Sequence, residues 1–300
     1  MAVSPRADLA EVTMDAFLKT AWDDHADRPQ EVADRIAASS HLVETPEQLA
    51  AFARLLTHVY GEHLGQWTRG IELLDSLRGH AAAAAGPAGI RAIDVGAAAL
   101  RYCGGDASAS AALPGQEQVA ALANASSALA ARDEFARAIA AYEQALQLAQ
   151  EAPSRVPPAM RVLAAAGNNL AVLLEAKVGR SATETQAMLA AAEAALTYWK
   201  QAGTWLEEER AEYRLARSRL QAGEAAAAVQ SAERCVAVCE RNGAPPFERF
   251  FAHSVLACAR RASGDASVFA EHRQVALRYF EQTSEEERKW CENERNELES

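Results

Sequence analysis

Three arginines in the second half of the chain have the spacing of residues on one helix face. Arg210, Arg214 and Arg217 are separated by four and three positions, and residues so spaced are neighbours on an α-helix. Arginine binds a carboxylate through two parallel hydrogen bonds, so this face is suited to an acidic segment. The acidic run 207–209 offers a second interpretation, in which the arginines pair locally along a solvated stripe. The sequence leaves both open.

Cysteines and a histidine in the second half of the chain are residue types that bind metals, but their spacing is not that of a metal site. Cys235 and Cys239 lie one helical turn apart, and His253 and Cys258 belong to the next helical segment. This spacing differs from that of zinc-binding motifs. Because buried thiols commonly serve as small packing residues, we expect packing here and no metal.

Two further groups near the N-terminus contain metal-binding residue types. Acidic residues surround His25 between positions 23 and 27, and we expect a solvated loop there. His58 and His63 are five residues apart, which places them on different faces of an α-helix. The sequence therefore predicts no metal site.

Catalysis has no support in the sequence. The segment 93–96, Ile-Asp-Val-Gly, is similar to the first motif of methyltransferases, but three alanines follow it in place of glycines. No strand precedes it, as that motif requires. The chain also shows no Ser/His/Asp order and no glycine-rich phosphate loop. We therefore expect no catalytic residues, no cofactor and no enzymatic activity.

The composition predicts an all-α protein. Half of the 300 residues are hydrophobic, alanine dominates among them, and aromatic residues make up only 6%. Many closely packed helices suit this composition better than one thick core. We find no alternating segment that is typical of a strand.

Net charge and hydropathy argue against several classes of protein. A formal charge of −11 argues against a general nucleic-acid binder, because phosphate binding needs clustered positive charge. No apolar run is long enough for a transmembrane helix, and the acidic N-terminal residues do not fit a signal peptide. The odd number of cysteines, five, fits reduced thiols. We expect a cytoplasmic protein that binds neither nucleic acid nor membrane.

The segment Gln118–Ala149 contains two amphipathic helical patterns joined by a short corner at residues 132–134. In the second pattern, Ala138 and Ala145 are small and Tyr142 between them is large. Small residues at helical spacing let two helix backbones approach closely, and the tyrosine fills the remaining space. The pattern predicts a pair of antiparallel helices.

Similar pairs follow along the chain. Ala125, Leu170, Leu215 and Leu256 are equivalent positions in the first helices, at intervals of 45, 45 and 41 residues. The small residues expected in the second helices are Ala187, Ala191 and Ala194, then Ala228, Ala232 and Cys235, then Ala276. Fixed intervals of this size are typical of arrays of stacked repeats.

The order, size and spacing of these residues resemble the tetratricopeptide repeat (TPR) family. The intervals exceed the 34 residues of the commonest form, and the long units are similar to the repeats of kinesin light chain-type proteins. The resemblance implies an α-solenoid of stacked antiparallel helix pairs, a TPR-like superhelix, in which the first helices line a concave groove.

The resemblance also implies which residues face that groove. On the first helices these are Asn124 and Ser127, then Asn168 and Asn169, then Arg210, Tyr213, Arg214 and Arg217. Asn124 and Asn169 are similar to the asparagines that hold the peptide backbone in kinesin light chain-type repeats. Alternatively, Asn124 and Asn169 are only polar residues on a solvated surface. Tyr213 is either an aromatic platform for a ligand or a packing residue.

We predict three regions along the chain. Residues 1–80 form an N-terminal helical cap with a degenerate repeat, and its first helix begins near Ser4-Pro5. Residues 81–283 form the TPR-like repeats, with helix boundaries unassigned between 79 and 118. Residues 284–300 form a charged capping helix with Trp290 buried against the array.

The function expected from this organisation is that of a non-enzymatic adaptor. It would bind a protein or an extended peptide in the concave groove, with a preference for acidic segments. Two alternatives stay open: a regulatory sensor that responds to a peptide or ligand, and a scaffold that self-associates. The sequence indicates neither the partner nor the oligomeric state.

Overall fold

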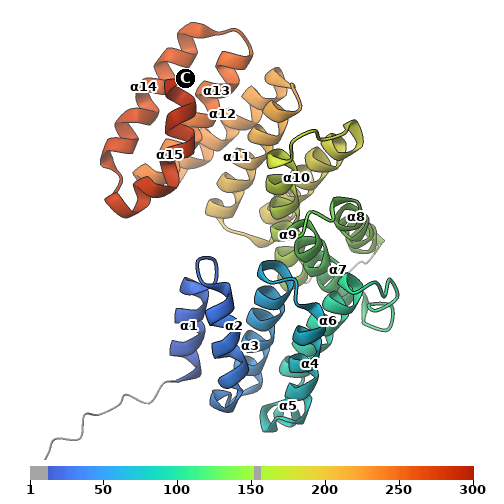
Figure 1. Ribbon diagram of the computed structural model, residues 1–300. Coiled ribbons are helices and arrows are strands. Elements are labelled where there is room, and N and C mark those ends of the chain that lie inside the picture. The colour runs from blue at the N-terminus through green and yellow to red at the C-terminus, as the bar shows by residue number, and fades with distance from the viewer. Residues whose placement is uncertain (1–12, 152–156) are drawn as a thin grey trace, which may run out of the picture. The chain divides into compact units, whose positions relative to one another are not determined.

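The described part of the chain, residues 13–151 and 157–300 of a computed structural model, is helical and contains no strand (Figure 1). Its contacts divide the chain into two compact units, one ending at Asp133 and the other beginning at Glu134. We describe each unit separately. The predicted first helix residues from Ser4 to Val12 lie outside the described residues, as does Pro153.

The first unit is built mainly of short helices. They are α1 (Met14–Asp24), α2 (Pro29–Ala38), η1 (Ser40–Leu42), α3 (Pro46–His58), η2 (Val59–His63), α4 (Trp67–Ser76), η3 (Leu77–Gly79), α5 (Ala81–Ala85), α6 (Pro87–Cys103) and α7 (Gly115–Ala130). Here η2 is a single π-helical turn that continues α3 directly. The boundaries that the sequence left open between residues 79 and 118 are those of η3, α5, α6 and the start of α7.

Close packing of α3 on α6 forms the centre of the first unit. Leu49 and Thr57 of α3 lie against Gly89 and Gly96 of α6. A Cβ added to Gly96 would lie 2.1 Å from Thr57 Oγ1, and one added to Gly89 would lie 2.5 Å from Leu49 Cδ2. The glycine of the methyltransferase-like segment is therefore a helix-packing residue, because only a residue without a side chain fits there.

The second unit consists of long helices. They are α8 (Phe135–Glu151), α9 (Pro157–Ala176), α10 (Ala182–Ala202), α11 (Trp205–Gln221), α12 (Ala225–Arg241), α13 (Pro246–Ala262), α14 (Ala266–Gln282) and α15 (Glu285–Glu299). Helices α9 and α10, α11 and α12, and α13 and α14 pack as pairs, and the first helices α9, α11 and α13 pack on one another in turn. This is the predicted stack of antiparallel helix pairs.

Glycines form the corners of these pairs. Gly179, Gly223 and Gly264 have φ values of 70°, 76° and 84°, in the left-handed region that costs glycine little. The corner at the end of the first unit uses Asp133, with a φ of 59°. The corners at Asp133, Gly223 and Gly264 lie where the repeat pattern predicts.

The small residues predicted for α12 are correct, whereas those for α10 are partly wrong. Ala228, Ala232 and Cys235 are fully buried in α12. In α10 the buried stripe runs through Met188, Ala191, Ala192, Ala195 and Leu196, while Ala187 and Ala194 lie outside it. Because alanine occupies every face of α10, the sequence could not identify which face packs.

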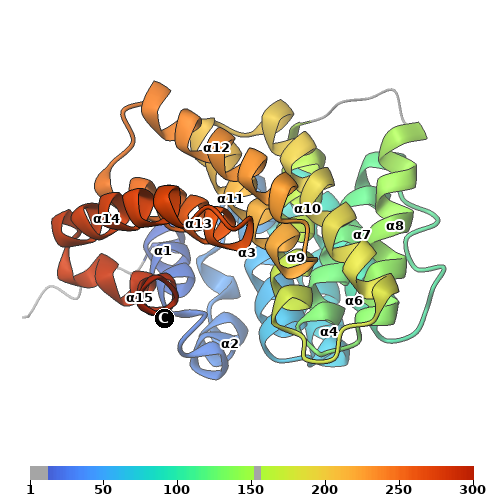
Figure 2. The same cartoon turned by 90° about the horizontal axis from the view of Figure 1, so that it is seen from above.

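Helix α15 covers one side of the α13–α14 pair (Figure 2). Cys291 and Leu298 are fully buried with Phe250 of α13. Trp290 is 73% exposed, so its predicted burial is wrong: the buried helix face includes the next residue instead. The helix begins with a capping box between Ser284 and Glu287, which satisfies backbone donors of its first turn.

Candidate functional site

The two asparagines predicted to face a groove on α9 differ in their exposure to solvent. Residues 163, 164, 166, 170, 171 and 174 are buried, whereas Ala165 and Asn168 are half-buried and Asn169 and Val172 are exposed. Asn169 carries both a donor and an acceptor to the surface. Asn168 is turned inward, and its Oδ1 atom is buried with no hydrogen-bond donor among the described residues.

The equivalent positions on α7 are less open. Asn124 is half-buried and Ser127 is only 4% exposed. Asn124 belongs to the first unit and Asn169 to the second. The expected ladder of asparagines along one groove therefore stays a prediction.

Each of the three arginines on α11 pairs with a glutamate of a different helix. Arg210 Nη2 lies 2.6 Å from Glu248 Oε1 of α13. Arg214 pairs with Glu175 of α9, and Arg217 pairs with Glu297 of α15. These partners are distant in sequence, so the arginines do not pair with the acidic run 207–209. They also do not form a stripe that contacts only solvent. Arg210 has the most accessible side chain of the three, at 55% exposed.

Tyr213 is held by contacts within the unit. Its hydroxyl donates a hydrogen bond to Glu294 Oε1 of α15, with an O···O distance of 2.6 Å. Its ring packs edge-on against Phe251, with centroids 5.6 Å apart. Burial, followed by the charge of Glu294, raises the pKa of the Tyr213 hydroxyl well above its ordinary value. The residue thus anchors α15 in this structure.

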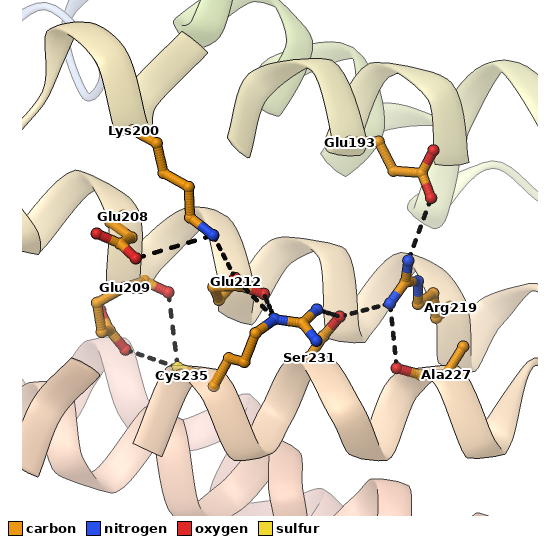
Figure 3. A network of polar contacts seen from close by, with 10 residues as sticks. Glu193, Lys200, Glu208, Glu209, Glu212, Arg219, Ala227, Ser231 and Cys235 are labelled. Atoms are coloured by element: carbon orange, nitrogen blue, oxygen red, sulfur yellow. Dashed lines mark hydrogen bonds and ion pairs between the residues drawn. The ribbon is translucent and has the colours of Figure 1, made fainter. Parts of the chain in front are cut away.

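Helices α10, α11 and α12 share a polar network in their interior (Figure 3). The fully buried carboxylate of Glu212 accepts hydrogen bonds from Lys200 Nζ at 3.0 Å and from Arg234 Nε at 2.9 Å. Arg234 and Arg219 both donate to the hydroxyl of Ser231, at 2.9 and 2.8 Å. Two cations on one buried carboxylate offset the desolvation of its charge.

A second buried carboxyl lies beside this network. Glu209 is 1% exposed, and the thiol of Cys235 donates a hydrogen bond to its Oε1 at 3.1 Å. Burial raises the pKa of Glu209 to about 8, and the nearby Glu248 adds to the rise while Cys235 opposes it. The carboxyl is a neutral acid over much of the physiological range.

The cysteines of the second unit are buried free thiols. Burial raises the pKa of the Cys235 thiol well above its ordinary value and that of Cys258 to about 12. His253 stacks on His272, with the two Nδ1 atoms 3.0 Å apart. The expectation of a packing role fits these contacts.

Three histidines of the first unit, His25, His58 and His63, do come together. The Nε2 atoms of His58 and His63 are 3.1 Å apart, and His25 packs against both rings. The expectation that His58 and His63 point to different faces is wrong. It assumed a continuous α-helix, whereas the π-helical turn η2 follows His58 and changes the angle between these two positions. No α-helical spacing rule could have found this group.

Solved structures with a similar fold share the repeat architecture. A crystal structure of nearly identical TPR-like repeats, described as a kinesin light chain of Podosopora anserina, superposes with a TM-score of 0.52 and 18% sequence identity, covering 81% of this chain and 100% of that chain. The crystal structure of a substituted form of the same repeats gives a TM-score of 0.51 and 18% identity, covering 79% of this chain and 96% of that chain.

No family model and no curated protein matches the sequence. Within the described residues, no helix combines the length and apolar character needed to span a bilayer. At 18% identity the structural matches report the fold. The chain has a TPR-like fold, as do the kinesin light chain-like repeats that it resembles.

Proposed function

We propose that the chain is a non-enzymatic adaptor that binds a protein or an extended peptide along its first helices. The observation that supports this most directly is the surface of α9, where Asn169 is exposed beside Val172, which is 37% exposed. The two residues are three positions apart and therefore lie on one helix face. An amide with an apolar neighbour suits a peptide, whose backbone is polar and whose side chains are partly apolar.

The amide of Asn169 has the chemistry for backbone recognition. It presents one carbonyl acceptor and two N–H donors, so it can bond to both the N–H and the C=O group of an extended chain. Asn124 has the same chemistry at the equivalent position of the preceding repeat.

A preference for acidic partners rests on α11. The arginines there already bind carboxylates of this chain, and α15 supplies two of the acidic contacts, Glu297 to Arg217 and Glu294 to Tyr213. The surface therefore accommodates an acidic helix. Arg210 is the cation that a partner's carboxylate would reach first, because it is the most exposed of the three.

Affinity capture with the full chain, followed by mass spectrometry, would provide candidate partners, and direct binding of each would then be measured. We expect Asn169→Ala to weaken binding at least tenfold and Arg210→Ala to weaken it more at low salt than at high salt. The matched control is Gln186→Ala, an exposed residue of the second helix α10.

The outcome is decisive in either direction. A partner that binds Asn169→Ala and Arg210→Ala as tightly as the unchanged chain does not use this face, and the proposal fails for it. Loss of binding in Gln186→Ala alone would place the interface on the second helices instead.

A further inference from the structure

Three imidazole rings of the first unit converge from two parts of the chain. His25 follows the C-terminus of α1, His58 ends α3, and His63 ends the π-helical turn η2. One ligand nitrogen from each lies within 4.8 Å of the others. The ring centroids are 4.8 to 5.0 Å apart. All three side chains are partly accessible, so an ion can reach them from solvent.

The π-helical turn is what brings His63 under His58. Five residues of α-helix would turn the side chain by about 140° away from that of His58. Here the Leu64 N–H donates to the Val59 carbonyl at 3.0 Å, a bond that spans five residues instead of four. This wider turn places the side chain of His63, five positions after His58, close to that of His58. Such turns are frequent at functional sites.

In two of the rings, Nδ1 is engaged by a hydrogen bond to an oxygen atom, which leaves Nε2 of each ring as the ligand atom. The Nδ1 atom of His58 lies 2.9 Å from Glu62 Oε1, and the Nδ1 atom of His25 lies 2.5 Å from the Trp22 carbonyl oxygen. Each Nδ1 then carries the proton, and each Nε2 keeps its lone pair. A carboxylate or carbonyl on the far nitrogen is the arrangement that metal-binding histidines use to fix ring orientation and raise basicity.

The distance between His58 and His63 fits two ligands of one ion, and His25, within 4.8 Å of both, would move closer on binding. Two nitrogens at 2.0–2.1 Å from a tetrahedral zinc ion are separated by about 3.3 Å. The Nε2 atoms of His58 and His63 are 3.1 Å apart, close to this value. Without an ion, one Nε2–H must donate to the other Nε2. An ion that binds between them moves the proton of His63 to Nδ1 or to solvent.

The surrounding charges are compatible with a cation. Glu62 is the negative group beside the rings, whereas Arg132, which donates to the Glu62 carbonyl oxygen at 3.2 Å, is the positive one. Burial, then the neighbouring rings of His58 and His25, lowers the pKa of His63.

We propose that His25, His58 and His63 form a binding site for one divalent transition-metal ion of the zinc class, with Glu62 positioning His58. Imidazole ligands suit zinc, copper and nickel rather than magnesium or calcium. Three protein ligands leave the fourth position of a tetrahedral ion to water or to a group from a partner. The ion links the end of α1 to the end of α3, two segments that also pack directly through Trp22 and His58.

The test uses the full, untagged chain after treatment with a chelator. Zinc chloride is titrated by calorimetry, and native mass spectrometry gives the stoichiometry. We expect one ion per chain. His58→Ala and His63→Ala should weaken binding at least 100-fold, and Glu62→Gln by about 10- to 100-fold. His41→Ala is the control, since this exposed histidine lies outside the cluster.

A measurement on the unchanged chain keeps the proposal open to refutation where a variant fails to fold. Zinc should shift the imidazole nuclear magnetic resonance signals of His25, His58 and His63 and leave that of His41 in place. Affinity should fall as pH decreases, because protons compete for the same nitrogens. Absence of binding, or a shift confined to His253 and His272, overturns the proposal.

Discussion

At the scale of single residues, Glu209 couples the second unit to pH. Its buried carboxyl has a pKa raised from the ordinary 4.5 to about 8, mainly by burial. Between these values the unfolded chain has released its proton while the folded chain retains it. The free energy of unfolding therefore decreases as pH rises from about 4.5 to 8, and the contribution is fully lost above the folded pKa.

Replacing this carboxyl by an amide should remove that pH dependence. We compare the free energy of unfolding of Glu209→Gln with that of the unchanged chain at each pH. This difference should favour the variant by about 2–4 kcal/mol more at pH 8.5 than at pH 5. The check is the urea midpoint of both proteins at pH 5, 6.5 and 8.5. The control is Glu208→Gln, which changes a part-exposed neighbour. If stability depends on pH in the same way in all three proteins, Glu209 is not the source of the pH dependence.

At the scale of elements, side chains decide how α15 is attached. Its sequence is strongly charged, yet the helix is fixed by a few apolar contacts, since Leu298 and Cys291 are buried with Phe250 and Ala276. The polar contacts of Glu294 with Tyr213 and of Glu297 with Arg217 add to this attachment and fix the orientation of the helix.

We therefore expect Leu298→Ala to loosen α15 and Trp290→Ala to leave it unchanged. Leu298 is 1% exposed and Trp290 is 73% exposed. Loss of the buried leucine should cost about 2 kcal/mol and raise amide hydrogen exchange throughout α15 by roughly 30-fold. Equal exchange in the two variants, or faster exchange in Trp290→Ala, would show that the helix docks by another face.

The helices and their contacts also show which structural features the sequence predicts and which it does not. The corners at Gly223 and Gly264 follow from glycine conformation and repeat spacing, and both are predicted correctly. The pairing of Arg214 with Glu175 spans 39 positions, so no spacing rule within one helix reveals it. The histidine cluster depends on a π-helical turn, and no residue type specifies such a turn. Local chemistry thus predicts the helices, whereas contacts between helices require coordinates.

At the scale of the whole molecule, each helix of the second unit contacts mainly the helices next to it in the stack. In such arrays stability is approximately a sum of unit stabilities and nearest-neighbour interfaces. The contacts also separate the chain at Asp133 and Glu134 into two compact units. Both features favour unfolding in more than one step, because no single core must be lost at once.

Tryptophan positions allow this to be measured. Trp22 and Trp67 lie in the first unit, whereas Trp199, Trp205 and Trp290 lie in the second. We expect urea unfolding followed by fluorescence and by circular dichroism to give different midpoints, because the two signals weight the two units differently. In Trp22→Phe/Trp67→Phe, fluorescence reports the second unit alone and should match only part of the circular dichroism change. Coincident curves with the steep denaturant dependence of a single 300-residue cooperative unit would contradict stepwise unfolding.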